Sequence, residues 1–239
     1  MDVDAPLLRL AGVGFGYDAA PAVLCGLDLA VGPAERVALL GANGSGKTTL
    51  LHLIVGLLPV RAGLIEAFGR PRRTEADFRE VRRRAGLVFQ DPEDQLFCPT
   101  VIEDVAFGPV NLGLSHDEAI AAAEGALADL GLAGYEQRIT YKLSGGEKRL
   151  VSLAAVLAMK PDVLLLDEPT ANLDARGRQR LIDALAARDE AMLLVTHDQD
   201  MARQLAVRAA LLGEGRIVAD RPAGELLADC ELLRRHGLR

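Results

Sequence analysis

The chain has 239 residues, half of them apolar, a length that suits a core domain with an attached subdomain. A formal net charge of -7 argues against a general nucleic-acid binder, whose surface would be basic, so we expect no nucleic-acid partner. The cysteines Cys25, Cys98 and Cys230 form no C-x-x-C pair, so we predict neither a disulfide framework nor a zinc site and expect a reducing compartment.

Two features bear on export and on membrane insertion. Acidic residues stand at the start of the chain, where a signal peptide would carry positive charge, so we expect no export. The longest apolar run, residues 50–60, is far shorter than the roughly 18 residues of a spanning helix. If this protein acts at a membrane, we therefore expect a partner protein to supply the membrane-spanning part.

The N-terminal segments 7–17 and 22–31 read as strands. The second alternates Leu27, Leu29 and Val31 with other residues, which is typical of a half-exposed antiparallel sheet. We expect these strands to form a lobe at the edge of the core.

Four short apolar runs predict a mostly parallel sheet buried under helices on both faces, and hence an α/β fold. They are "RVALLG", "GLVFQ", "VLLLDE" and "AMLLVTHD". Ligands of such sheets bind at the carboxyl ends of the strands. We therefore expect the chemistry at the residues that end these runs, namely Gly41, Gln90, Asp167, Glu168 and His197.

The segment 91–160 is helical in composition and reads as an inserted subdomain, with Leu150, Ala154 and Leu157 on one helix face. The arginines between Arg70 and Arg84 are explained by a solvated helix face about as well as by a basic patch. We predict a core, including the antiparallel lobe, over 1–90 and 161–222, the helical subdomain over 91–160, and a short C-terminal extension over 223–239.

"GANGSGKT", residues 41–48, matches G-x-x-x-x-G-K-[ST] between an apolar strand and a predicted helix. A glycine-rich turn lets backbone N–H groups surround a phosphate, and the helix N-terminus adds a favourable dipole. Lys47 supplies a positive charge and Thr48 a hydroxyl for magnesium. The predicted phosphate-binding residues are Gly41, Asn43, Gly44, Ser45, Gly46, Lys47, Thr48 and Thr49.

"VLLLDE" ends in a carboxylate pair. In a P-loop NTPase the aspartate, here Asp167, holds magnesium, and Glu168 is then free to orient and deprotonate the attacking water. The structural alternative is that Glu168 caps the turn before Pro169.

"LSGGEKRL", residues 143–150, contains a capping box of Ser144 and Glu147. The box does not explain Gly145 and Gly146, since glycine in a helix costs about 1 kcal/mol relative to alanine. Bare N–H groups at a helix N-terminus suit a second phosphate site. If two copies pack head to tail, each could close over the triphosphate held by the other.

These motifs, in this order, resemble those of ABC-type ATPases, the nucleotide-binding subunits of ABC transporters. "GANGSGKTT" resembles their Walker A, Gln90 their Q-loop glutamine, "LSGGE" their signature, "VLLLDEP" their Walker B, "ANLD" with Asn172 and Asp174 their D-loop, and His197 their switch histidine. Glu147 replaces the commoner glutamine, which keeps the capping box but adds a negative charge near the partner's triphosphate.

The resemblance implies ATP and Mg2+ as cofactors, with Thr48, Gln90 and Asp167 as metal ligands and Glu168, His197 and Gln90 in the catalytic step. It also implies that the core binds ATP and that Tyr17 stacks on adenine, although an ordinary sheet-edge tyrosine is the alternative. His197 has a similar alternative as a hydrogen-bonded histidine at a strand end. His52, His116 and His236 are expected to be structural.

The segment from Asp91 to Pro109 resembles the face that docks on a transmembrane partner, and we expect Leu96 and Phe97 to be exposed on it. The sequence of this segment, together with that of residues 140–174, resembles the ATPases of energy-coupling-factor (ECF) importers, most closely the cobalt/nickel (CbiO-like) type. The implied partners are a transmembrane coupling protein, a substrate-binding membrane subunit and a second ATPase subunit, which we expect to be another copy rather than a paralogue.

The implied location is the cytoplasmic face of the cell membrane. Scattered histidines and cysteines give no ligand spacing, so metal selection would belong to a membrane partner. Segment 223–239 resembles a dimerising extension but could equally be a plain closing helix. The alternatives are an ECF ATPase for a vitamin, a soluble ABC ATPase acting on a macromolecular assembly, and a P-loop kinase, which would leave "LSGGE" and "ANLD" unexplained.

Overall fold

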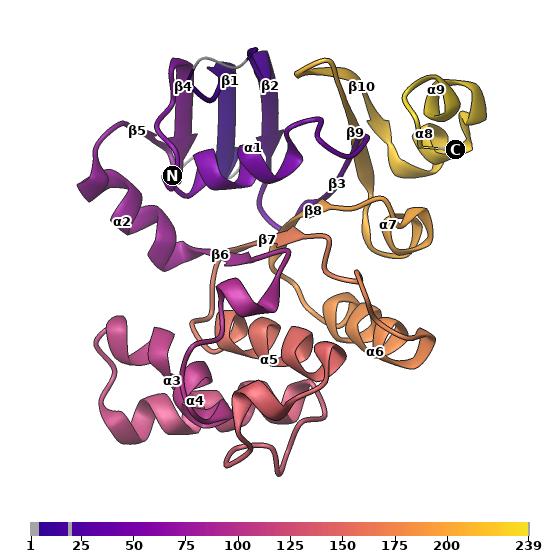
Figure 1. The fold of residues 1–239 in the computed structure, drawn as a ribbon. Coiled ribbons are helices and arrows are strands. Elements are labelled where there is room, and N and C mark those ends of the chain that lie inside the picture. The colour runs from indigo at the N-terminus through magenta and orange to yellow at the C-terminus, as the bar shows by residue number, and fades with distance from the viewer. Residues whose placement is uncertain (1–4, 19–20, 239) are drawn as a thin grey trace.

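The computed structural model describes residues 5–18 and 21–238, and its N-terminal lobe is a four-stranded antiparallel sheet (Figure 1). The strand order is β2-β1-β4-β5. Leu27, Leu29 and Val31 are buried, as their alternation predicted. The strands are β1 (Leu8–Phe15), β2 (Leu24–Val31), β4 (Ala62–Ala67) and β5 (Arg70–Arg72).

The core is a six-stranded sheet in the order β10-β9-β3-β8-β7-β6. All neighbours pair in parallel except β10, which runs antiparallel to β9 at one edge. Every residue of β7 and β8 is buried, as expected for strands covered on both faces. The strands are β3 (Arg36–Leu40), β6 (Ala85–Val88), β7 (Val163–Asp167), β8 (Ala191–Val195), β9 (Arg208–Gly213) and β10 (Arg216–Pro222).

One face of this sheet packs on the N-terminal lobe through α1 (Lys47–Ile54). Leu50, Leu51, Leu53 and Ile54 of α1 are fully buried, and they share one apolar cluster with residues of both sheets. The helix α2 (Glu75–Arg84) joins the lobe to β6, and its Phe78 and Val81 close the same cluster.

The other face supports a helical subdomain (Figure 1). It contains α3 (Val101–Asn111), α4 (His116–Asp129) and α5 (Gly145–Leu157), with single turns at Pro92–Asp94 and Thr140–Lys142. Leu150, Ala154 and Leu157 are buried as predicted. Because α5 lies between α3, α4 and β6, it is buried on its other faces as well.

The C-terminal part adds α6 (Ala175–Ala186), α7 (Gln199–Leu205), α8 (Ala223–Ala228) and α9 (Cys230–Arg235). The predicted extension thus contains two short helices, and Leu226, Leu227 and Leu233 join the core. No helix within the described residues is long and apolar enough to cross a membrane. The predicted boundaries of core, subdomain and extension stay predictions.

Candidate nucleotide site

Most of the predicted site residues meet at the carboxyl ends of the parallel strands. The glycine-rich loop follows β3, Asp167 ends β7, and β8 runs between these two strands. A cavity of about 430 Å³ opens there. It is lined by Tyr17, Val23, Asn43, Gly44, Gly46, Lys47, Thr48, Thr49, Gln90, Asp167 and Glu168.

The loop between β3 and α1 takes a backbone path that needs glycine. Gly44 and Gly46 have φ angles of 78° and 103°, in the left-handed region. A Cβ on Gly46 would lie 2.8 Å from Val23, and one on Gly41 would lie 2.7 Å from the Leu212 carbonyl. Gly46 is also the N-cap of α1 and has no side chain to accept from the first N–H groups, so these remain available to an anion.

Lys47 is buried at the base of the cavity. Its Nζ donates to the carbonyls of Gly41 at 2.8 Å and Ala42 at 2.9 Å. Burial lowers the pKa of Lys47, while the nearby carboxylates of Glu168 and Asp167 act in the opposite direction. The ammonium group is therefore held beside the loop that it is predicted to serve.

Asp167 and Thr48 offer oxygen atoms that suit a hard cation. Burial raises the pKa of Asp167, and the hydrogen bond with the Thr48 hydroxyl partly opposes this rise. Within the described residues, the buried Oδ1 of Asp167 has no hydrogen-bond partner. A buried carboxylate oxygen without a donor, next to a hydroxyl, matches the oxygen ligands that Mg2+ prefers.

Glu168 leaves the end of β7 with a φ of 46°, an unusual value for a residue with a side chain. Its Oε2 accepts from the backbone N–H of His197 at 3.2 Å and lies 2.8 Å from His197 Nδ1. The carboxylate therefore contacts the predicted switch histidine instead of capping the turn before Pro169. His197 itself does not line the cavity, and its side chain is 64% exposed.

The signature motif lies in a second, separate cavity of about 510 Å³. The capping box is present, since Glu147 N–H donates to Ser144 Oγ at 3.3 Å and Ser144 N–H donates to Glu147 Oε2 at 2.8 Å. The D-loop residues Asn172 and Asp174 line the same space, and Asp174 caps α6. The lining residues are Ser144, Gly145, Gly146, Glu147, Leu150, Asn172, Asp174, Arg176, Gly177 and Arg180.

Nothing among the described residues requires glycine at the first position of α5. A Cβ on Gly145 would meet no heavy atom within 4 Å, and one on Gly146 would lie 3.3 Å from Leu173. Both residues are helical, with no positive φ. If a close approach explains Gly145, the approaching group belongs to another molecule or to a ligand.

Tyr17 stands at the mouth of the first cavity and is 47% exposed. Its hydroxyl lies 3.1 Å from Thr49 Oγ1, and its ring meets Phe15 edge-on with centroids 5.0 Å apart. These contacts fix the ring beside the glycine-rich loop. Stacking on adenine stays a prediction.

The family model described as "ABC transporter" matches residues 24–171. The chain belongs to the ABC transporter family. The predicted P-loop fold is confirmed, and so is the prediction of an ATPase whose ATP hydrolysis is coupled to transport.

Individual relatives cover nearly the whole of this ABC ATPase. It is 45% identical to the cobalt import ATP-binding protein CbiO of Rhodobacter capsulatus over 98% of this chain and 85% of the relative. It is 41% identical to the energy-coupling factor transporter ATP-binding protein EcfA2 of Methanospirillum hungatei over 98% of this chain and 60% of the relative. The solved structure of cbiO1 from Clostridium perfringens superposes with a TM-score of 0.84 and 33% identity, covering 98% of this chain and 95% of that one.

Sequence reasoning missed Arg149, a buried cation of this ABC ATPase. Its guanidinium donates to the carbonyls of Phe89 at 2.8 Å and Gln90 at 2.5 Å, which ties the signature helix α5 to the segment after β6. Burial lowers the pKa of Arg149, and Asp91, Asp167 and Glu168 oppose the change. Its partners are backbone atoms about sixty positions away, so no local pattern indicates them.

A second missed contact joins the D-loop helix to the residue after His197. Arg178 on α6 donates to both carboxylate oxygens of Asp198 at 2.6 Å, and Thr170 adds a hydrogen bond of 3.2 Å. Asp198 is also the N-cap of α7. The sequence "THD" places Asp198 beside a predicted site residue, which was the only available hint.

The predicted docking segment of the ABC ATPase borders a groove of about 770 Å³. Phe97 and Phe107 are 67% and 47% exposed, and their rings pack edge to face with centroids 4.8 Å apart. The expectation for Leu96 was wrong, because the turn at Pro92–Asp94 directs its side chain into the core, where it is buried. Arg79, Arg82 and Arg83 of α2 are among the residues that line the groove.

Proposed function

We propose that the chain is the ATP-hydrolysing, energising subunit of an ECF-type importer for cobalt or nickel ions. The observation that carries the proposal is the presence of two separate cavities on one chain, one with the glycine-rich loop and one with the signature and D-loop. The 45% identity to a protein named for cobalt import supports this cargo. The 41% identity to a protein named for an energy-coupling factor transporter supports the ECF type.

In the proposed site, the loop amides and Lys47 bind the phosphates of ATP, and Tyr17 stacks on the adenine. Thr48, Asp167 and Gln90 would hold Mg2+, which supplies charge neutralisation at the phosphates. Glu168 orients and deprotonates the attacking water, and His197 contacts the γ-phosphate. Two observations support these roles: Asp167 Oδ1 is buried without a hydrogen-bond partner among the described residues, and Glu168 contacts His197.

The second cavity would complete the nucleotide site of another copy, so that Ser144, Gly145 and Gly146 face the triphosphate bound by the partner. The open space beside Gly145 supports this arrangement. Mixing a Lys47→Ala chain with a Ser144→Arg chain tests it, because one mixed dimer then contains one site with both intact halves. We expect each variant alone to be inactive and the mixture to regain ATP hydrolysis; normal hydrolysis by either variant alone would contradict the shared site.

We further propose that the groove beside Phe97 and Phe107 receives a helix of a transmembrane partner, which places the chain at the cytoplasmic face of the membrane. Exposed aromatic rings around an apolar groove are typical of helix-in-groove recognition. A substrate-binding membrane subunit would select the metal.

The test is to tag the chain in its native cell, isolate what it binds in mild detergent, and reconstitute the complex in vesicles. Cobalt or nickel uptake that needs ATP on the side of this chain would support the importer. Uptake of a vitamin instead would support the ECF-type importer but contradict cobalt or nickel as its cargo. Purely soluble partners would overturn the importer and favour an ABC ATPase acting on a macromolecular assembly.

A further inference from the structure

Glu147 places a carboxylate in the cavity that is proposed to meet a triphosphate. It is the third residue of α5 and lines the second cavity with Ser144 and Gly146. The Ser144 backbone amide, the Tyr135 hydroxyl and the Ser144 hydroxyl lower the pKa of Glu147, so the side chain is ionised at neutral pH. An unpaired negative charge there would repel the phosphates that the helix N-terminus attracts.

The structure gives each oxygen of Glu147 its own set of donors. Oε2 accepts from the Ser144 N–H and Oγ, both at 2.8 Å, and so completes the capping box. Oε1 accepts from the Tyr135 hydroxyl at 2.8 Å and from Arg138 Nη1 at 3.0 Å. The Arg138 guanidinium also lies over the Tyr135 ring, 3.6 Å from its centroid.

These surroundings suit a carboxylate better than an amide. With glutamine at position 147, the single amide oxygen could serve either Ser144 or the pair of Tyr135 and Arg138. The amide NH2 would then face either the Arg138 guanidinium or the Ser144 N–H, which can only donate. Arg138 therefore supplies a counter-charge, and Tyr135 a hydrogen-bond donor, that match glutamate at this position.

We propose that Arg138 and Tyr135 are positioning residues that neutralise and orient Glu147, so that the N-terminus of α5 can accept the triphosphate bound by a second copy of this chain. The inference rests on the proposed function of the second cavity. Arg138 and Tyr135 thereby compensate for the glutamate that stands in the signature in place of the commoner glutamine. Arg138 acts through Glu147 and makes no contact with the nucleotide.

A double-substitution cycle tests this in the Glu168→Gln background, where slow hydrolysis lets ATP-bound dimers persist. The readout is the ATP concentration that gives half-maximal dimer by light scattering. We expect Arg138→Gln to raise this ATP concentration about tenfold, because the substitution leaves the Glu147 carboxylate unpaired, facing the negatively charged triphosphate at the interface. In a chain that also carries Glu147→Gln, the same Arg138 substitution should change the half-maximal ATP concentration less than about twofold.

Three further variants separate charge from fold. Arg138→Lys keeps the positive charge and should restore dimerisation, whereas Tyr135→Phe removes only the hydroxyl and should have a smaller effect than Arg138→Gln. Arg73→Gln, between β5 and α2, removes one exposed positive charge away from the cavity and should change nothing. The loss caused by Arg138→Gln should also shrink at high salt.

Equal losses with and without the Glu147→Gln substitution would overturn the inference, because Arg138 would then act on the nucleotide or on the fold. Unchanged dimerisation of Arg138→Gln would overturn the inference as well, but the second cavity could still complete the nucleotide site of a partner. If the parental Glu168→Gln chain does not dimerise at any ATP concentration, the proposed function of the second cavity fails, and the inference fails with it.

Discussion

Nδ1 of His197 lies 2.8 Å from Oε2 of Glu168. The backbone N–H of His197 reaches the same oxygen at 3.2 Å, so one residue holds this carboxylate oxygen from two directions. Glu168 is 6% exposed, whereas the His197 side chain is largely in solvent. The backbone N–H and the imidazole of His197 therefore both constrain the orientation of the buried Glu168 carboxylate.

We predict that His197→Ala lowers kcat for ATP about a hundredfold, since a small displacement of the group that orients the water is enough for such a loss. KM should change much less, because the glycine-rich loop and Lys47 are untouched. Steady-state kinetics measures both. His116→Ala, on the exposed start of α4, is the matched control and should be normal. A loss confined to KM would remove His197 from this role.

Glu168→Gln should slow turnover at least about a hundredfold while ATP binding is kept, because an amide cannot accept the proton of the attacking water. Single-turnover kinetics with labelled ATP gives the rate, and size-exclusion chromatography should show an accumulated ATP-bound dimer. Near-normal turnover would mean that another group is the base.

Gly145→Ala separates folding from function. The added methyl group meets open space and a helical backbone, so the free energy of unfolding should stay within about 1 kcal/mol of the parent or rise. ATP hydrolysis should fall at least about tenfold if the partner's triphosphate approaches this backbone. Gly125→Ala, in open space on α4, is the control that should gain stability and keep its activity. Full activity of Gly145→Ala would leave its glycine unexplained.

Phe97→Ser should weaken the complex with the transmembrane partner without affecting the ATP affinity of the isolated chain. Phe97 is 67% exposed, so its loss from the free chain uncovers little buried surface. Co-purification from detergent-solubilised membranes measures the complex. Val218→Ser, at an exposed apolar position on β10, should leave the complex intact. Equal binding by both variants would place the docking surface elsewhere.

Asp198→Asn should lower stability in a pH-dependent way. Burial acts to raise the pKa of Asp198, but the hydrogen bonds from Arg178 and Met201 outweigh it and hold the pKa below its usual value. Because the pKa of this carboxyl group is lower in the folded than in the unfolded chain, its charge stabilises the folded state at any pH above the pKa of the unfolded chain. This stabilisation is lost as the pH falls through the pKa of the folded chain.

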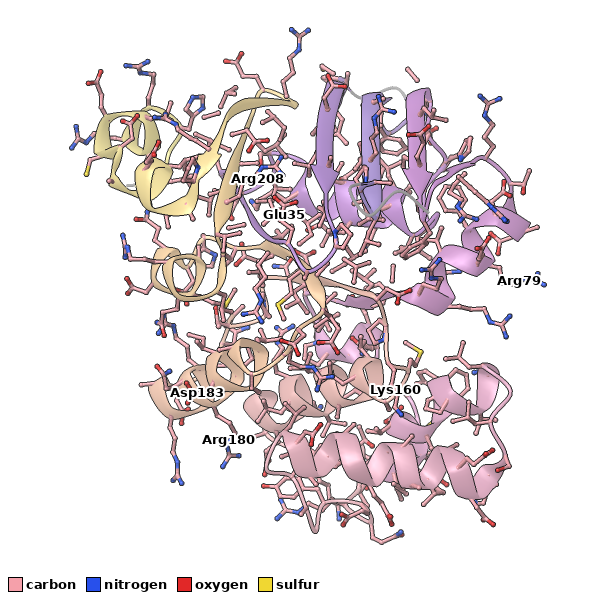
Figure 2. The ribbon with its side chains drawn as sticks, turned by 180° about the vertical axis from the view of Figure 1, so that it is seen from behind. Glu35, Arg79, Lys160, Arg180, Asp183 and Arg208 are labelled. Carbon is pink, nitrogen blue, oxygen red and sulfur yellow. The ribbon has the colours of Figure 1, made fainter. Side chains whose placement is uncertain are left out.

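The difference between parent and Asp198→Asn should therefore be about 2 kcal/mol near neutral pH and should shrink below about pH 4. Urea titrations across this range measure it. The control is Asp183→Asn, on the exposed side of α6, where Figure 2 labels Asp183 and Arg180. A difference that stays constant with pH would show that the ion pair with Arg178 contributes nothing through its charge.

Unbroken apolar runs were enough to predict β3, β6, β7 and β8, because strands buried on both faces leave that pattern in the sequence. The strands β9 and β10 were not predicted. The run of β9 is rich in alanine, which does not distinguish strand from helix. It pairs with β3, far away in the chain, and its first residue, Arg208, lies 2.9 Å from Glu35 (Figure 2).

The sequence left the arginines between Arg70 and Arg84 open between a solvated helix face and a basic patch, and neither description fits Arg72. That residue lies on β5, is 3% exposed and donates to the Ala67 carbonyl at 3.0 Å and 2.8 Å. The motif residues were found because each has a fixed spacing within a short segment. Arg149 and Arg178 were missed as buried or partly buried cations because their partners are set by the tertiary fold. Arg72 bonds Ala67 within the hairpin of β4 and β5, a local contact that no motif indicates.

Consecutive residues after β6 open onto different cavities, since Phe89 lines the apolar groove and Gln90 lines the nucleotide cavity. Arg149 holds the carbonyls of both. A buried guanidinium cannot give up these acceptors without a large desolvation penalty. Because Arg149 bonds both carbonyls, we expect a displacement of α5 relative to the sheet to move the peptide of Phe89 and Gln90, and so to change the wall of the groove and of the nucleotide cavity together.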